Sequence, residues 1–437
     1  MELTVSYGNR IPVLFVLCSI LAFSLLNLAP VRVVNAESVT EVGPSTCPGI
    51  GGNWSNGSCV LSTPYTVQRG DTLEVPLNAS LSVTWSDSLT NNGTLVNSGT
   101  IYAYSGRIVN LATFTNSGNI TASGYGGDMS YPLDAEIANQ GSFTTYGNLT
   151  VSIYAGAGVA NSGKLANFGT ITLSNSASDG IVNFGTVTNY GVIHVATQHT
   201  TVNSGTDGID NVILVQNATF TNRGTITVST ADNSVGIVNS AGNIPSRAAN
   251  FINDGNITVT SIGSDSTGIV NYDDAHGTFV NDARGTITIS NRVASSTGMV
   301  NVNATVSNLG TLNVSNARGT GIFNWGGGTI VNDGMLVDDG TIVNNATVSN
   351  CGGRTVGTVP TSGNFMVGCL TVNEVRVVTE VVYTSQSQAG DGWTLESLAL
   401  STSVILAIAV VALVLLLFRE RAARSPGGRM DEKTENL

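Results

Sequence analysis

A short repeated unit constrains the fold of this chain more than any other feature of its sequence. The unit reads Asn-X-Gly-Thr-Ile, with small changes in the last two positions, and begins at Asn97, Asn116, Asn167, Asn183, Asn222, Asn253 and Asn308. A second unit, Gly-Ile-Val-Asn, alternates with it and begins at Gly180, Gly236 and Gly268, with the variants Gly-Met-Val-Asn at Gly298 and Gly-Ile-Phe-Asn at Gly321. The full period is about 24 to 32 residues, and repeats of this length cannot bury a core alone. The pattern therefore predicts a solenoid, in which each repeat packs on its neighbours.

The residues within each repeat favour strands over helices. Runs such as Thr225–Ser229 alternate Thr with Ile and Val, which gives each strand one apolar face. The Asn-X-Gly step then turns the corner, because Asn and Gly tolerate positive φ. Near the end of the repeats, Ile330, Leu336 and Ile342 fall six residues apart. We expect residues 80–350 to form an all-β solenoid with Ile stacked on Ile inside and Asn stacked on Asn at the corners.

Two other folds are compatible with this composition. A disordered, low-complexity stalk is disfavoured by the regular placement of Ile, Val, Phe and Leu. An array of β-sandwiches is disfavoured because the strands here are more closely spaced than the roughly 8–12 residues typical of such domains.

An apolar segment near each end of the chain predicts how it is placed in the cell. The run Ile11–Leu28 follows Arg10, and Ala36 ends a small-residue cleavage pattern, so residues 1–36 are predicted to be a signal peptide. An uncleaved N-terminal anchor is the alternative. Residues 398–418 carry no charge, are followed directly by arginines, and are long enough for a transmembrane helix, with a buried core helix as the alternative.

Together these segments predict a single-pass, type I protein of the cell membrane with its N-terminus outside. Residues 385–397 are rich in Ser and Gly and are expected to form a flexible stalk. Residues 419–437 form the predicted cytoplasmic tail, which is too short to hold a catalytic domain.

Four cysteines remain after the predicted cleavage, and they flank the repeats in two close pairs. Sequence proximity favours disulfides Cys47–Cys59 and Cys351–Cys369, although four cysteines allow three pairings. We expect the pairs to stabilise an N-terminal cap at residues 37–79 and a C-terminal cap at residues 351–384 in an oxidising compartment. A zinc site is the alternative, but neither pair has a CxxC spacing or a nearby His.

Eleven Asn-X-Ser/Thr sequons are candidate N-glycosylation sites if the chain is exported. A sequence rich in Asn and Thr also produces such triplets by chance, and an Asn inside a repeat could instead face the neighbouring coil. The candidates are Asn53, Asn56, Asn78, Asn92, Asn119, Asn148, Asn217, Asn256, Asn303, Asn313 and Asn345.

Charge and motif content narrow the function classes. The net charge of -12 argues against a nucleic-acid partner, which would need a basic surface. The candidate acids for a glycan-cleaving site are Asp207 with Asp210, Asp338 with Asp339, and Asp273 and Asp274 beside His276. The simpler interpretation is that these acids are solvated loop residues. Adjacent acids on a strand point to opposite faces, so a doublet does not by itself form a catalytic pair. Weak Ca²⁺ binding by these loops is possible. We therefore predict no catalytic residue and no cofactor.

Histidines and aromatic residues offer weaker signals. His194 and His199 have no Cys or acid at metal-ligand spacing. Several aromatic side chains could line a sugar-binding strip, although stacked core or corner residues are the commoner role. They are Trp85, Phe168, Phe184, Tyr190 and Trp325.

The region Cys47–Cys369 resembles Asn/Gly-rich cell-surface proteins of archaea and bacteria. The resemblance is carried by the Cys47…Gly52-Asn53-Trp54…Cys59 segment, the segment Tyr65–Pro76 and the Asn-X-Gly-Thr-Ile repeats that follow. It implies the right-handed parallel β-helix of pectin-lyase-like and adhesin-type proteins. That scaffold carries adhesins, surface-layer components and polysaccharide-cleaving enzymes alike, so it predicts fold more strongly than activity.

The sequence predicts a non-enzymatic, membrane-anchored surface protein that presents a glycosylated solenoid outside the cell. Its expected partners are the membrane and cell-surface glycans or other envelope proteins. The main alternative is a membrane-tethered polysaccharide lyase or glycoside hydrolase on the same scaffold. A solute-binding receptor is a third option, which the short predicted tail disfavours.

Overall fold

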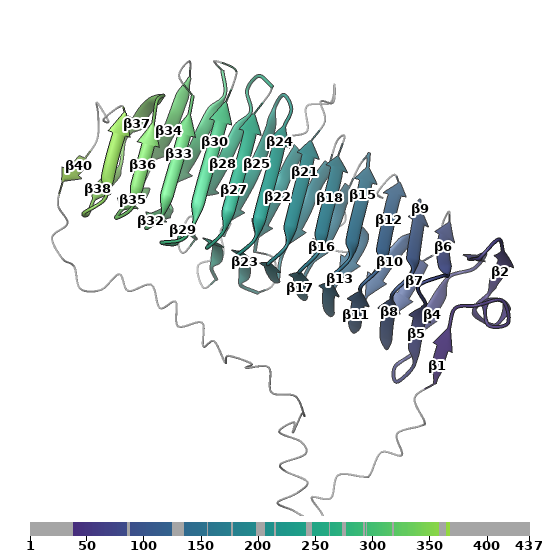
Figure 1. The fold of residues 1–437 in the computed structure, drawn as a ribbon. Coiled ribbons are helices and arrows are strands. Elements are labelled where there is room, and N and C mark those ends of the chain that lie inside the picture. Colours follow the sequence, from purple (N-terminus) through teal and green to yellow (C-terminus); the bar gives the residue numbers. More distant parts are fainter. Residues whose placement is uncertain are drawn as a thin grey trace, which may run out of the picture. The chain divides into compact units, whose positions relative to one another are not determined.

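The described part of the chain consists almost entirely of β-strands. The computed structural model describes residues 38–84, 88–124, 135–154, 156–175, 178–197, 206–213, 216–241, 247–261, 263–272, 277–291, 293, 295–316, 319–357 and 364–367. These residues form forty strands and one short 3-10 helix, η1 (Cys47–Ile50), and contain no α-helix. The strands make three sheets, A, B and C, of 14, 14 and 12 strands (Figure 1).

Within each sheet the strands lie side by side in a regular spatial order. Sheet A contains β1 (Val39–Glu41), β5 (Thr72–Val75), β8 (Thr94–Asn97), β11 (Thr113–Asn116), β14 (Ser142–Thr145), β17 (Lys164–Asn167), β20 (Thr186–Asn189), β23 (Ala218–Asn222), β26 (Ala249–Asn253), β29 (Thr278–Asn281), β32 (Thr305–Asn308), β35 (Thr329–Asn332), β38 (Thr347–Asn350) and β40 (Asn364–Val367). Sheet B contains β2 (Gly52–Ser55), β3 (Ser58–Leu61), β6 (Ser80–Thr84), β9 (Thr100–Tyr104), β12 (Asn119–Gly124), β15 (Asn148–Ile153), β18 (Thr170–Asn175), β21 (Val192–Thr197), β24 (Thr225–Thr230), β27 (Asn256–Ser261), β30 (Thr286–Asn291), β33 (Thr311–Ser315), β36 (Met335–Asp338) and β39 (Arg354–Gly357). Sheet C contains β4 (Tyr65–Val67), β7 (Ser88–Asn91), β10 (Arg107–Asn110), β13 (Ala135–Asn139), β16 (Gly156–Asn161), β19 (Ser178–Asn183), β22 (Thr206–Val212), β25 (Ser234–Ser240), β28 (Thr267–Tyr272), β31 (Thr297–Val302), β34 (Thr320–Trp325) and β37 (Thr341–Asn344).

The strands wind as a solenoid, because from β3 to β36 each one pairs in parallel with the strand three places further along the chain. Strand β9 pairs with β12, β10 with β13, and β11 with β14. One coil therefore consists of one strand from sheet B, one from sheet C and one from sheet A. Sheet C has one strand per coil, so the described residues form twelve complete coils, β3 to β38, where the sequence suggested about ten. The predicted all-β, parallel solenoid is present.

The six-residue step seen in the sequence is the distance from one sheet to the next. Ile330 lies in sheet A, Leu336 in sheet B and Ile342 in sheet C. The shortest coil, from Asn332 to Asn350, takes 18 residues, whereas the coil from Asn189 to Asn222 takes 33. The surplus residues of the longer coils lie between strands, so the pairing register is unchanged.

The core is a set of apolar columns that run the length of the stack. In sheet B, Ile101, Ile120 and Leu149 lie directly over one another in consecutive coils, each with at most 1% of its surface exposed. In sheet A, the rings of Phe220, Phe251 and Phe279 stack with centroids 4.9 Å apart. Each fully buried side chain of this kind contributes on the order of 2–3 kcal/mol relative to exposure. The predicted column of Ile over Ile is confirmed.

Two ladders of buried asparagines mark two of the three corners. In each ladder, the Nδ2 group of one Asn donates to Oδ1 of the Asn in the next coil, over 2.6–2.9 Å. The sheet A ladder is interrupted at Thr145, whose Oγ1 accepts from Asn116 Nδ2 over 2.9 Å. The sheet C ladder contains Asn91, Asn110, Asn139, Asn161, Asn183, Asn211, Asn239, Asn271, Asn301, Asn324 and Asn344. The sheet A ladder contains Asn97, Asn116, Thr145, Asn167, Asn189, Asn222, Asn253, Asn281, Asn308, Asn332 and Asn350. The predicted stacking of Asn on Asn is confirmed.

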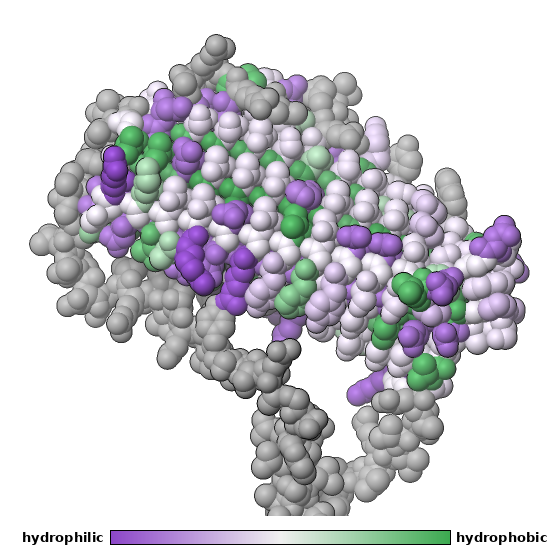
Figure 2. Space-filling view, viewed as in Figure 1, coloured by the Kyte–Doolittle hydropathy of each residue, from purple (hydrophilic) through white to green (hydrophobic). Residues whose placement is uncertain are grey.

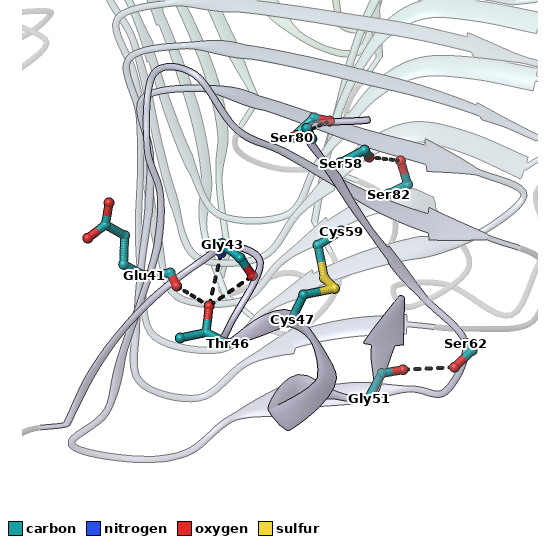
Figure 3. The surroundings of a disulfide bond; sticks show 11 residues. Glu41, Gly43, Thr46, Cys47, Gly51, Ser58, Cys59, Ser62, Ser80 and Ser82 are labelled. Atoms are coloured by element: carbon teal, nitrogen blue, oxygen red, sulfur yellow. Dashed lines mark hydrogen bonds between the residues drawn. A yellow bond between two sulfur atoms is a disulfide. The ribbon is translucent and has the colours of Figure 1, made fainter. Parts of the chain in front are cut away.

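A disulfide-bonded hairpin closes the N-terminal end of sheet B. Strand β2 pairs antiparallel with β3, which ends the run of parallel pairing and covers an otherwise open sheet edge. Figure 3 shows the predicted Cys47–Cys59 disulfide joining η1 to β3, near the Thr46 hydroxyl that accepts a hydrogen bond from Gly43 N. Gly52 is required here, because a Cβ at this position would lie 2.6 and 2.8 Å from the two sulfur atoms.

Several predicted features lie outside the described residues. These are the signal peptide 1–36, the stalk 385–397, the transmembrane helix 398–418 and the tail 419–437. Within the described ranges, no helix has the length and apolar character needed to cross a bilayer. Cys351 is disulfide-bonded, and Cys369, the partner expected for it, is not among the described residues. Of the predicted caps, 37–79 includes the first coil, β3 to β5, and 351–384 includes β39 and β40, which continue sheets B and A.

Candidate functional site

A row of exposed aromatic rings runs along the corner between sheets A and B. Tyr146, Phe168 and Tyr190 occupy the same corner position in three consecutive coils and are 57%, 45% and 42% exposed. Their ring centroids lie 5.1 and 4.7 Å apart, with interplanar angles of 14° and 3°. The rings therefore cover one another face to face and present their edges to solvent.

Charged side chains continue this corner row. The Arg223 guanidinium lies 5.5 Å from the Tyr190 ring centroid, and its Nη1 donates to the Tyr190 hydroxyl over 3.2 Å. In the following coils, Arg284 Nε donates to Asp254 Oδ1 over 2.9 Å. One face of Tyr190 is thus covered by a cation, whereas Tyr146 at the other end of the row has no second ring partner among the described residues.

The aromatic residues named in the sequence analysis do not form one strip. Phe168 and Tyr190 come together as expected, but Phe184 lies at the corner between sheets C and A and is 4% exposed. Trp325 is exposed in strand β34, where it stacks on Phe323 at 5.9 Å, and Trp85 is outside the described residues. Tyr146 was missed because Thr145 replaces the Asn of the repeat at this corner.

The eleven sequon asparagines form a set entirely separate from the two ladders. None of them belongs to a ladder; ten are exposed and the eleventh, Asn313, is partly exposed. The reason lies in the repeat itself, since a ladder Asn in Asn-X-Gly has Gly where a sequon needs Ser or Thr. Some of them still face a neighbouring coil, because Asn148 Nδ2 donates to Asn119 Oδ1 over 3.0 Å and Gly327 N donates to Asn303 Oδ1 over 2.8 Å.

Four of these asparagines project from the outer face of sheet B. Asn119, Asn148 and Asn256 are the first residues of their strands, and Asn313 is in β33. The rest of this face is largely Thr and Ser, such as Thr172 and Thr227, with His194 exposed between them. The side of the solenoid drawn in Figure 2 is mostly coloured as near-neutral, with hydrophilic residues scattered over it.

Three aspartates gather on the outer face of sheet C. Asp179 lies in β19, Asp207 and Asp210 lie in β22, and Asp207 N donates to Asp179 Oδ1 over 3.0 Å. Strict alternation would place Asp207 and Asp210 on opposite faces. Gly208 and Ile209 are both buried, however, and this break in alternation returns Asp210 to the outer face.

Burial and mutual repulsion favour the protonated forms in this cluster. The pKa of Asp207 is raised to about 7, by burial first and by the negative charge of Asp179 second. The pKa of Asp210 is raised well above its ordinary value by burial and then by Asp207 and Asp179. Asp210 Oδ1 is buried without a hydrogen-bond partner. The cluster thus places Asp207, whose pKa is about 7, beside Asp210, whose pKa burial also raises.

Two further buried acids lie inside the stack. Asp338 replaces Val314 in an inward column of sheet B, accepts from Gly340 N over 2.8 Å, and has its pKa raised to about 6 by burial. Glu136 in β13 is 2% exposed, and burial raises its pKa to about 7 although Arg107 acts in the opposite direction. Asp338 and Asp339 point to opposite faces, as the sequence analysis expects of adjacent acids. Glu136 was not among the acids named from the sequence, because no pattern there marks it as buried.

The other site residues named from the sequence lie outside the residues that the structure describes. Asp273, Asp274, His276 and His199 are outside the described residues. Among the residues that are described, no group of three or more His, Cys, Asp or Glu could hold a metal ion. No protein-family model matches this sequence, and comparisons with curated proteins and with solved structures found no match.

Proposed function

We propose that this chain is a membrane-anchored structural or adhesion protein of the cell surface, which displays N-glycans on a right-handed β-solenoid. The predicted signal peptide and transmembrane helix would export and anchor it, as in the adhesin-type proteins that its sequence resembles. Its surface would contact cell-surface glycans or other envelope proteins through many repeated weak interactions rather than through one pocket.

The separation between ladder asparagines and sequon asparagines is the observation that supports this proposal most strongly. Attachment of a glycan requires an accessible side chain, and all eleven sequon asparagines are exposed or partly exposed residues. The 20 or so buried ladder asparagines, which a glycan would disrupt, all lack the Ser or Thr that marks an acceptor. Glycans could therefore be added without breaking a single ladder hydrogen bond.

The oxidised cysteines support export. Cys47 and Cys59 are joined, and Cys351 is also disulfide-bonded. Disulfides persist in extracellular compartments and are rare in the reducing cytosol. The Cys47–Cys59 disulfide stabilises the N-terminal end of the stack, where a sheet edge would otherwise be open.

Site-resolved glycopeptide analysis tests the proposal. The full chain is expressed in a eukaryotic host that glycosylates exported proteins, and surface exposure is measured with a protease added outside intact cells. We expect glycans on several of the eleven sequons and cleavage of the solenoid from outside. A chain that stays inside the cell, or that reaches the surface without any glycan, would refute it.

The aspartate cluster on sheet C favours a second candidate, a glycoside hydrolase. Such enzymes pair a protonated acid with an ionised carboxylate, and Asp210 and Asp207 have raised pKa values beside Asp179. The test is release of reducing sugar from a panel of acidic and neutral polysaccharides at pH 5–7. Activity that is lost in Asp210→Asn but kept in Asp265→Asn, an exposed acid elsewhere on the stack, would favour the enzyme over the structural protein.

A further inference from the structure

We propose that the N-glycan on Asn119 packs its first sugar ring against the open face of Tyr146. The two residues lie in consecutive coils, β12 and the corner after β14. This inference rests on the proposed function, since it requires the chain to be exported and glycosylated. It assigns one particular sequon a role in the surface structure.

One face of the Tyr146 ring is not covered by another ring from the described part of the chain. Phe168 covers one side of the ring, and the other side looks towards the preceding coil, where Ser117 holds the equivalent corner position. Ser117 is small and exposed, so Tyr146 keeps 57% of its surface accessible. Adjacent coils are about 4.8 Å apart, which is the separation at which a flat ring stacks on an aromatic face.

Asn119 lies in the coil next to that of Tyr146. Asn119 is exposed, follows Ser117 by two residues and is in the coil that the open face of Tyr146 looks towards. Its Oδ1 accepts a hydrogen bond from Asn148 Nδ2 over 3.0 Å. Because this bond engages only Oδ1, Nδ2 of Asn119, the atom that would carry the sugar, takes no part in it.

The chemistry of the two groups matches. One face of a pyranose ring exposes C–H groups with partial positive charge, and the face of a tyrosine ring is negative. The Ser117 hydroxyl, beside the ring, can donate to or accept from a sugar hydroxyl. Asn148 is less suitable, because its Nδ2 already donates to Asn119 and because the corner of its own coil is filled by Tyr146 itself.

Asn256 provides a matched control within the same molecule. It also is the exposed first residue of a sheet B strand, two residues after a corner residue. The corner residue there is Asp254, which is paired with Arg284 from the next coil, so no open aromatic face is available. A glycan on Asn256 should therefore extend freely into solvent.

The experiment measures how fast a peptide N-glycosidase removes each glycan from the folded full chain on the surface of intact cells. Glycopeptide mass spectrometry follows Asn119 and Asn256 in the wild type, in Tyr146→Ala and in Phe168→Ala. We expect release from Asn119 to be slower than from Asn256 by about threefold or more, as one aromatic stacking contact would give. In Tyr146→Ala the two rates should become equal, whereas Phe168→Ala should preserve most of the difference.

The possible outcomes separate this inference from the proposed function. Equal rates in the wild type, or a difference that survives Tyr146→Ala, would overturn the packing of this glycan. An Asn119 that is unoccupied while other sequons carry glycans would overturn it as well and leave the proposed function standing. An exported chain with no glycan at any sequon would refute the proposed function itself.

Discussion

The Asn253 side chain donates from Nδ2 to Asn281 Oδ1 over 2.8 Å, although the two residues are 28 positions apart in the sequence. The same Nδ2 group reaches the carbonyl oxygens of Gly255 and Thr286, over 3.1 and 3.3 Å. Asn253 Oδ1 in turn accepts from Asn222 over 2.8 Å. One buried side chain thus joins three consecutive coils and fixes their register.

Removal of this rung should weaken the stack far more than removal of an exposed asparagine. Asn253→Ala leaves Asn222 Nδ2 and Asn281 Oδ1 buried without their partner, and we expect a loss of about 3 kcal/mol. Asn256→Ala, three residues away and exposed, should cost roughly 0.5 kcal/mol or less. Denaturant unfolding of the unglycosylated protein provides the comparison. Equal losses in the two variants would show that the ladder does not hold the coils.

Removal of a ring from the buried aromatic stack should destabilise the fold more than removal of a ring from the exposed stack. Phe251 is fully buried between Phe220 and Phe279, so Phe251→Ala creates a cavity and should cost about 3–5 kcal/mol. Phe168→Ala removes a stacked but exposed ring and should cost about 1 kcal/mol or less. Thermal melts of the two variants measure the difference. A larger loss from the exposed ring would contradict the assignment of the core.

Stability should fall as pH rises from about 4.5 to about 7. The pKa of Glu136 is about 7 in the folded chain and 4.5 ordinarily, so the fold retains a proton that the unfolded chain releases. The stabilising contribution is complete below pH 4.5 and is lost as the pH passes 7. It amounts to on the order of 3 kcal/mol for this shift.

Glu136→Gln isolates this contribution. Gln keeps the size of the side chain but cannot ionise, so the decline in unfolding free energy between pH 5 and pH 8 should become smaller. Asp207, Asp210 and Asp338 also have raised pKa values and should leave a remaining slope of the same sign. Glu74→Gln, at an outward position of β5, is the control. An unchanged slope in Glu136→Gln would show that its carboxyl group is not desolvated in solution.

Reduction of the N-terminal disulfide should act locally. The Cys47–Cys59 bridge closes a loop with a sequence separation of 12, which corresponds to about 3 kcal/mol. Because each coil contacts only its neighbours, Cys47→Ser with Cys59→Ser should speed hydrogen exchange in β3 and β6 and leave β24 unchanged. Faster exchange throughout the stack would indicate that the cap supports all coils and not only the first.

Sequence periodicity was sufficient for the repeating parts of this structure. Asn-X-Gly and alternating Thr and Ile predicted the corners, the columns and the ladders, since each depends only on residues a fixed distance apart. The three-sheet cross-section was not apparent, because the connection from sheet B to sheet C varies in length and obscures the regular six-residue steps, such as Leu89, Leu95 and Ile101.

The candidate sites depend on departures from the repeat and could not be predicted in the same way. Asp207 and Asp210 share a face only because alternation breaks at Gly208. Tyr146 joins the corner row at a place where Thr145 replaces the expected Asn. Such departures are recognised only when the coils are aligned in space, since nothing in the linear pattern marks which irregular residue will lie beside which.

The coil from Asn189 to Asn222 is almost twice as long as that from Asn332 to Asn350, and yet both close onto their neighbours by the same Asn bond. Extra residues between the strands therefore leave the Asn bond between coils unchanged. A lineage that carries this scaffold could exchange whole surface segments, one winding at a time. Such exchanges would change the binding surface of the protein without changing its core or its asparagine ladders.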